Sequence, residues 1–129
     1  MIAMAPAGRY GARTMAAEDW SDNVYIVHLA EDPAFSEEVE NLLRRCADDP
    51  RHVVLDLAAV GFVNSSNLSQ LIRLRQALGN TSCHVMLAAV RPEVWNAFRV
   101  AGLDKLFNAV ESVPLALAGL QLSEATASE

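Results

Sequence analysis

The sequence predicts an α/β fold in which helices pack against a small, mostly parallel sheet. Short apolar runs of strand length alternate with longer segments whose apolar residues recur at helical spacing, an order typical of parallel sheets. The segment from His52 to Leu78 shows this most clearly, because a near-continuous apolar run precedes a short loop and an amphipathic helical pattern. No internal repeat or linker divides the 129 residues, so we expect one domain.

The first half of the chain is expected to hold a tail, two strands and one helix. A stretch rich in Ala, Gly and Pro predicts the tail, and β-branched and aromatic residues predict the better of the two strands. An Asp that can cap, followed by a Pro that is tolerated at the first helical position, predicts the helix start. In chain order the expected elements are a flexible tail (1–12), a weak edge strand (12–17), a strand (23–29) and a helix opened by Asp32 and Pro33 and stopped by Pro50.

The second half is expected to alternate strands with helices more regularly. Helix starts are assigned from Ser, Asn or Pro, and helix ends from Gly or Asn after the last apolar residue of a stripe. The ordered domain is expected to span 13–122, followed by a polar tail over 123–129. The expected elements are a strand (52–57), a serine-led helix ended by Gly79 and Asn80, a strand (83–89), a helix from Pro92 to a Gly102 cap, a short strand (106–110) and a helix from Ser112 and Pro114 to about residue 122.

Charge and composition exclude several classes of function. The chain is 52% hydrophobic with a net charge of −6, and no helical face gathers Lys and Arg. Binding to nucleic acid or to an anionic membrane surface is therefore disfavoured, because both depend on a basic footprint. No apolar run is long enough to span a bilayer, so direct membrane insertion is not expected. The two cysteines, Cys46 and Cys83, indicate core residues in a reducing compartment, and we expect a cytoplasmic protein.

Two adjacent serines mark the start of the serine-led helix. Either one of them caps the helix, or Asn64 caps it and leaves a hydroxyl of Ser65 or Ser66 without a structural role. A phosphate at this position would be favoured by the helix dipole and nearby backbone N–H groups, so a modified domain should stay folded. A partner that binds the unmodified hydroxyl would instead face nearly two added negative charges after phosphorylation.

Catalytic and metal sites are less well supported by the residues. The serines lack the flanking glycines of a G-x-S-x-G hydrolase motif, and Gly61 lacks the partners of a phosphate-binding loop. His28, His52 and His84 have no metal-binding spacing. Asp56 is expected to support the loop, either by bonding to the backbone at the head of the serine-led helix or by lying at the solvent-exposed end of its strand; a part in the site is the less favoured alternative. We therefore expect no catalytic residue, no metal and no cofactor.

The segment VVLDLAAVGFVNSSNLSQLIRL resembles the STAS domain, the family of sulfate transporters and anti-sigma factor antagonists. It is similar to that family's apolar strand ending in Leu-Asp-Leu and its apolar-Asp-Ser-Ser-Gly-Leu turn. The segment HVMLAAVRPEVWNAFRVAGLDKLFNAV adds a matching strand, helix with a late Gly-Leu, and short strand. The resemblance covers about residues 23–120 and implies a small mixed sheet with helices packed on one side.

The resemblance also implies a function. Family members of the antagonist type are not enzymes; they bind an anti-sigma factor that is also a serine kinase. Phosphorylation at the start of the second helix dissolves that complex. The matching residue here is Ser65, with Ser66 as a weaker candidate. Two positions depart from the pattern, because the family's Asp is Asn64 and its Gly is Asn67. These departures could alter recognition by the kinase or accompany loss of the phosphorylation.

Two functions follow as expectations. The first is a phosphorylation-switched binding domain that uses Asn64, Ser65, Ser66, Asn67, Ser69, Gln70 and Arg73, with Leu68, Leu71 and Ile72 turned inward. The alternative is a non-phosphorylated STAS scaffold or transporter-associated subunit, which would contact other STAS domains or the cytoplasmic face of a membrane complex. A kinase-like partner would support the first function, and membrane components or a large homotypic assembly would support the second.

Overall fold

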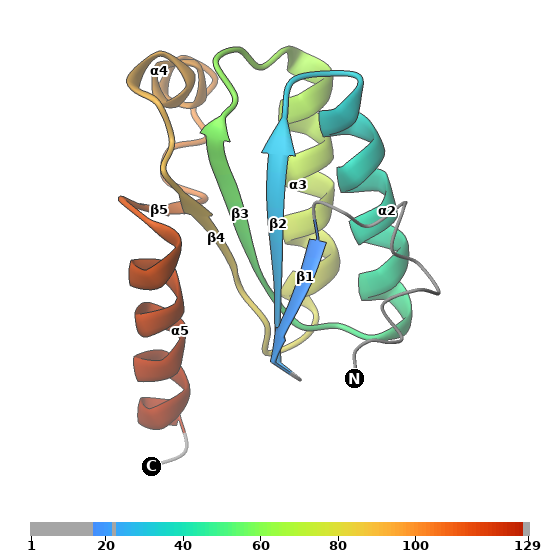
Figure 1. Ribbon diagram of the computed structural model, residues 1–129, viewed down its shortest axis with the longest axis vertical. Helices are drawn as coiled ribbons and strands as arrows, with labels where there is room; N and C mark the ends of the chain where they lie inside the picture. The colour runs from blue at the N-terminus through green and yellow to red at the C-terminus, as the bar shows by residue number, and fades with distance from the viewer. Residues whose placement is uncertain (1–16, 22, 128–129) are drawn as a thin grey trace.

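The computed structural model describes residues 17–21 and 23–127, and these form one α/β unit with a five-stranded sheet. Figure 1 shows the sheet between two layers of helix. The elements of the described residues are, in chain order, β1 (Ala17–Ser21), β2 (Val24–Ala30), α2 (Ala34–Asp48), β3 (His52–Ala59), α3 (Ser65–Gly79), β4 (Val85–Ala88), α4 (Pro92–Val100), β5 (Asn108–Val110) and α5 (Val113–Ala127).

The sheet is mixed and mostly parallel, as the sequence predicts. Its strand order is β1-β2-β3-β4-β5; β1 runs antiparallel to β2, and the other neighbours pair in parallel. β3 lies at the centre, and its residues Val53, Val54, Leu55 and Leu57 are completely buried. A strand that is apolar at successive positions needs cover on both faces, because successive side chains point to opposite sides.

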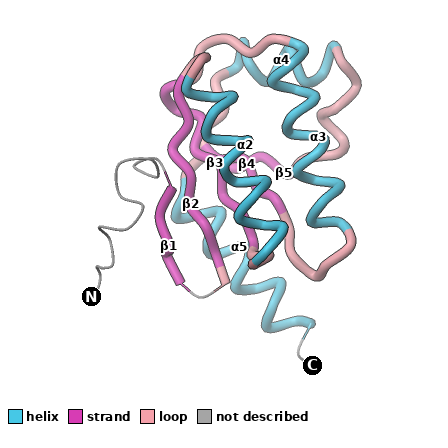
Figure 2. Tube along the Cα trace, turned by 90° about the vertical axis from the view of Figure 1, so that its right-hand side faces the viewer, coloured by secondary structure: helices cyan, strands magenta, loops and turns pink. Residues whose placement is uncertain are grey.

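That requirement corrects one expectation, that all helices lie on one side of the sheet. α2, α3 and α4 do share one face, where the large core cluster includes Phe35, Leu71 and Phe98. α5 packs against the opposite face, where Ala116 and Leu120 belong to a second cluster with residues of β2, β3 and β4. Figure 1 shows α5 separated from α2 and α3 by the sheet, and Figure 2 shows the molecule from the side on which α2 and α3 lie.

The ends of the chain differ from the expected boundaries. The described part of the edge strand is Ala17–Ser21. The expected tail and residues 12–16 of the expected edge strand lie outside the described residues. α5 continues to Ala127, beyond the expected end near residue 122. The added segment contains Ala and Glu and no Gly or Pro, so nothing in it stops a helix.

The arrangement of α2 and α3 creates the region of interest. Both helices begin at the carboxyl ends of β2 and β3, at the top of Figure 1, where parallel sheets commonly place their binding sites. The loop between β3 and α3 is anchored by the buried side chains of Val60 and Val63. Its Gly61 N–H donates to Glu31 Oε2 at 2.8 Å. The start of α3 is therefore held in a fixed position beside the start of α2.

Candidate functional site

The start of α3 is closed by a reciprocal pair of asparagines. The Asn64 side-chain oxygen accepts a hydrogen bond from the Asn67 N–H at 2.8 Å, and the Asn67 side-chain oxygen accepts from the Asn64 N–H at 3.1 Å. The backbone of Asn64 is extended, with φ −107° and ψ 175°, as a capping residue requires. The prediction that Asn64 caps this helix is confirmed, and Asn67 completes a capping box.

This cap leaves both serines without a structural task. Ser65 and Ser66 are exposed in the first turn of α3, and neither hydroxyl has a hydrogen-bond partner among the described residues. Phe62, in the loop just before the cap, is also turned outward and is 68% exposed. An exposed apolar ring a few residues before two unbound hydroxyls is typical of the mixed composition of a protein-binding surface. Ser69 and Arg73 continue the exposed side of the helix.

A carboxylate from the β2–α2 loop is bound to the same cap. Asp32 Oδ2 accepts hydrogen bonds from the side-chain nitrogens of Asn64 and Asn67, both at 3.1 Å. The other oxygen, Oδ1, accepts from the N–H of Ser36 at 2.9 Å and from its hydroxyl at 2.7 Å. One carboxylate therefore binds the first turn of α2 and joins it to the first turn of α3. The sequence predicts the interaction of Asp32 with the start of α2, but it places Pro33 inside the helix, whereas Pro33 occupies the N-cap position and α2 begins at Ala34.

These bonds keep Asp32 ionised. The hydrogen bond from the Ser36 hydroxyl contributes most, and together with the backbone N–H and the two asparagine amides it lowers the pKa of Asp32 from 3.8 to about 2. A fixed negative charge therefore lies at the junction of α2 and α3 at neutral pH. The side chain is nevertheless exposed, so solvent weakens its contribution to stability.

Acid should remove this contribution in a defined range. Because the pKa of Asp32 is lower in the folded protein, its stabilising effect is present above the unfolded value near 4 and is lost as pH falls toward 2. We expect the urea midpoints of wild type and Asp32→Asn to differ more at about pH 6 than at about pH 2.5. A difference that stays constant between these pH values would contradict the assignment, because the other carboxyl groups titrate in both proteins.

Two residues expected on the docking surface are turned inward instead. Asn67 is 2% exposed and Gln70 is 6% exposed, because both point across the gap between α3 and α2. Gln70 Nε2 donates to Glu40 Oε2 at 3.1 Å and to the Ser36 carbonyl at 3.4 Å. The polar side of α3 is thus divided: Ser65, Ser66 and Ser69 face solvent, and the two amides hold α2 in place. The Gln70 side-chain oxygen is buried without a partner among the described residues.

The polar contacts between α2 and α3 form a seam that consists of Ser36, Glu40, Asn67 and Gln70. Arg73 lies at the exposed edge of this polar seam. Its guanidinium contacts Glu40 at 3.1 Å, and both side chains are partly exposed. The hydrogen bond from Gln70, followed by the charge of Arg73, lowers the pKa of Glu40. Leu68, Leu71 and Ile72 were expected to be turned inward. Leu71 is buried, and Leu68 and Ile72 are partly buried. Leu74, which the sequence interpretation omits, is also completely buried.

The remaining chemistry-bearing residues lie outside this region or are structural. Asp56 Oδ2 lies 2.8 Å from His28 Nδ1, and its Oδ1 accepts from the Ala58 N–H at 3.0 Å. Both partners lie in β2 or β3, so Asp56 supports the end of β3 and does not bond to the start of α3, which was one of the two expectations. Burial raises the pKa of the Cys46 thiol to about 11, which makes the thiolate scarce. Within the described residues no group of three or more His, Cys, Asp and Glu side chains could hold a metal ion. Across those same residues, every helix is too short or too polar to cross a membrane.

The residues missed by sequence interpretation are Asp32 as a bridge, Ser36, Glu40 and Phe62. Ser36 and Glu40 are four residues apart and lie on one face of α2, and Asp32 precedes Ser36 by the same interval in the β2–α2 loop. That polar face could be read from the sequence, but its contact with the amides of α3 could not. Asp32 and Asn67 are separated by 35 residues, and only the packing of the two helices brings them together.

Comparison with known proteins identifies the family. The family model described as "STAS domain" matches residues 21–116. A STAS-domain containing protein of Pseudomonas aeruginosa (strain UCBPP-PA14) is 30% identical over 71 residues, which cover 55% of this chain and 70% of that protein.

Solved structures support the same fold. The anti-sigma factor antagonist SpoIIAA in its unphosphorylated form superposes with a TM-score of 0.71 at 13% identity, covering 81% of this chain and 94% of that one. The phosphorylated form of SpoIIAA from Bacillus gives 0.65 at 12% identity, covering 81% and 96%. A chain of the stressosome, described as a signal integration and transduction hub, gives 0.66 at 20% identity, covering 81% and 95%. Sequence and fold agree, and this chain belongs to the STAS domain family.

Proposed function

We propose that this chain is a cytoplasmic regulatory binding domain of the anti-sigma factor antagonist type, not an enzyme. In this proposal it binds an anti-sigma factor that is also a serine kinase, and phosphorylation of Ser65 releases that partner. The observation that carries the proposal is the exposed, unbonded hydroxyl of Ser65 in the first turn of α3. Because Asn64 and Asn67 satisfy the cap, Ser65 can be modified without removing a structural bond.

The proposed docking surface consists of Phe62, Ser65, Ser66, Ser69 and Arg73, all exposed on the loop and outer side of α3. Phe62 would supply apolar contact area, and the serine hydroxyls would supply neutral hydrogen-bonding groups. Asn67 and Gln70 support this surface from beneath by fixing α3 against α2. Arg73 contacts Glu40, so part of its charge is compensated before a partner arrives.

Phosphorylation would affect the free and bound states differently. In the free domain the added phosphate lies at the positive end of the α3 dipole, which favours it. The ionised Asp32 opposes the phosphate from the neighbouring loop, so the net effect on folding should be small. In the complex the same charges would have to leave water against a surface complementary to a hydroxyl. The existence of SpoIIAA in phosphorylated and unphosphorylated forms supports a switch on this fold.

Intact-mass analysis tests the assignment of the serine. After incubation with ATP and the cognate kinase, wild type should gain the mass of one phosphoryl group, and Ser65→Ala should not. Ser66→Ala is the matched control, because Ser66 is also exposed in the same turn, and it should be modified like wild type. A mass gain that survives Ser65→Ala and disappears in Ser66→Ala would contradict the assignment to Ser65.

A second function is supported by the likeness to a stressosome chain. A STAS scaffold would assemble with other STAS domains and would need no phosphorylation. The amides at Asn64 and Asn67 fit this alternative too, since they already occupy the helix start with internal bonds. Affinity purification from the native host separates the two functions. A kinase-like partner supports the first, and a large assembly of STAS proteins or membrane components, without modified Ser65, supports the second.

A further inference from the structure

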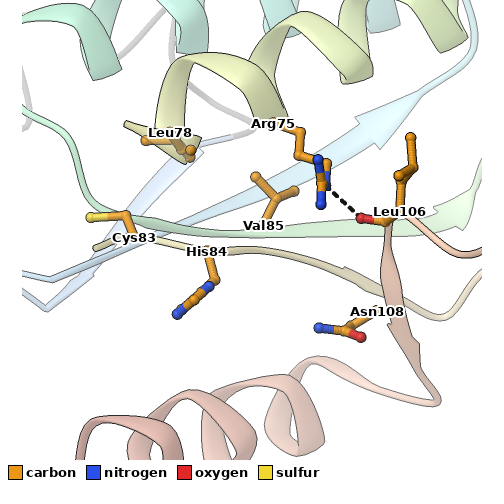
Figure 3. A pocket seen from close by; sticks show the side chains of 8 residues that line it. Arg75, Leu78, Cys83, His84, Val85, Leu106 and Asn108 are labelled. Carbon is orange, nitrogen blue, oxygen red and sulfur yellow. Dashed lines mark hydrogen bonds between the residues drawn. The ribbon is translucent and has the colours of Figure 1, made fainter. Parts of the chain in front are cut away.

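A polar hollow lies at the edge of the sheet, far from the docking surface. It has a volume of about 350 Å³ and is formed where the last turns of α3, the start of β4 and the segment leading into β5 meet. Figure 3 shows Arg75 and Val85 on one side of the β4 ribbon and His84 and Asn108 on the other. Because side chains from both sides line the same hollow, a ligand in it can contact polar groups of either side. The size falls within the range of small-molecule sites.

Arg75 is fixed in position. Its Nε donates to the carbonyl oxygen of Leu106 at 2.7 Å, drawn as the dashed line in Figure 3. Its two terminal nitrogens have no partner among the described residues. A guanidinium held by one nitrogen keeps the paired donors that bind a carboxylate or phosphate in a bidentate manner. The bond to Leu106 also limits the rotamer freedom that would otherwise be lost on binding.

His84 and Asn108 supply two further unpaired polar side chains. The His84 ring stacks on the ring of His52 with centroids 5.4 Å apart, so its orientation is fixed while its edge stays in solvent. Neither the His84 ring nitrogens nor the Asn108 amide is hydrogen-bonded within the described part of the chain. Arg75, His84 and Asn108 come from three different elements, and the fold alone brings them to one hollow.

The charge balance favours an anion. Arg75 carries the full charge of the lining, and no carboxylate belongs to it, although the whole chain has a net charge of −6. The carboxyl end of α3 opposes an anion with about half a negative charge. That opposing effect is reduced because the Leu78 carbonyl already accepts bonds from the Thr81 hydroxyl at 2.7 Å and from its N–H at 3.0 Å. The full positive charge of Arg75 therefore exceeds the partial negative charge at the carboxyl end of α3.

We propose that this hollow binds a small organic anion through a carboxylate or phosphate group on Arg75. Polar groups of the same ligand would bond to His84 and Asn108, and its carbon atoms would lie against Leu78, Val85 and Leu106. Arg75 lies about 15 Å from Ser65 along α3, at about 1.5 Å per residue. A ligand here would leave the docking surface uncovered, so this proposal is independent of the proposed phosphorylation switch.

Titration of the ¹⁵N-labelled full chain tests the site. The probes are inorganic phosphate and glycerol 3-phosphate at constant ionic strength, followed through the backbone amides. We expect saturable shifts centred on His84, Val85 and Asn108, with glycerol 3-phosphate binding several-fold more tightly than phosphate. Arg75→Gln should weaken binding at least tenfold. Arg99→Gln, which removes the same charge from the exposed last turn of α4, should leave it unchanged.

Three results would overturn the proposal. One is the absence of saturable shifts with either probe. Another is equal weakening by Arg75→Gln and Arg99→Gln, which would indicate general ionic attraction. The third is equal affinity for the two probes, which would exclude an organic ligand. Asn108→Ala keeps the bond between Arg75 and Leu106 and serves as the second variant if Arg75→Gln disturbs folding; it should weaken glycerol 3-phosphate binding and spare the chain's stability.

Discussion

Ser65→Asp is expected to weaken binding of the proposed anti-sigma partner by about 30-fold or more while leaving thermal stability nearly unchanged. The loss follows from burying an unpaired carboxylate against a surface that fits a hydroxyl, a change that costs about 2–5 kcal/mol at interfaces. Stability should hold because the hydroxyl of Ser65 makes no bond within the described residues. A carboxylate in the first turn of α3 also interacts favourably with the helix dipole, by about 0.3–1 kcal/mol.

Binding should be measured by calorimetry or surface plasmon resonance, and stability by thermal unfolding of the free domain. Ser65→Asn is the matched control, because it adds a similar side chain without a charge; it should retain binding within a few-fold of wild type. Equal loss in both variants would mean that bulk, not charge, is the cause. A large drop in the midpoint for Ser65→Asp would assign Ser65 a structural role and contradict the proposal.

The order of strands and helices is readable from sequence because it depends on local patterns. β3 was predicted from a run of apolar residues, and the start of α3 from Asn64, whose capping preference is intrinsic to its side chain. The Gly102 cap was predicted in the same way, and its φ of +77° is the left-handed conformation that glycine adopts readily. Each of these features is decided within a few residues of chain.

Features that depend on packing between distant segments were not predicted. The inward orientation of Gln70 is decided by Glu40 and the Ser36 carbonyl on α2, and a single helical pattern contains no information about that neighbour. Polar residues on an otherwise exposed helix were read as solvated, whereas two of them form the seam with α2. The position of α5 on the second face likewise depends on how the whole sheet is covered.

The same seam explains why an amide is suited to position 64 in this chain. The family's carboxylate at that position would lie against Asp32, whose Oδ2 now accepts a hydrogen bond from the Asn64 side chain at 3.1 Å. Asn64→Asp would replace that bond with repulsion between two carboxylates. Asp and Asn cap equally well, and the dipole favours Asp by no more than about 1 kcal/mol. Loss of a bond to a charged group costs about 1.5–3 kcal/mol; solvent around the exposed Asp32 reduces this cost, and repulsion between the two carboxylates adds to it. The net effect should therefore be destabilising.

Asn64→Asp is therefore expected to destabilise the domain by about 1–2 kcal/mol at neutral pH, measured by urea unfolding. Asn96→Asp adds the same charge on the exposed side of α4 and should change stability by less than about 0.5 kcal/mol. The double variant Asp32→Asn with Asn64→Asp exchanges the two groups and restores an amide facing a carboxylate. It should be more stable than the sum of the single changes predicts, by about 1 kcal/mol or more. Additive single effects would show that the two side chains do not interact, and the coupling between the β2–α2 loop and the cap of α3 would then have to be abandoned.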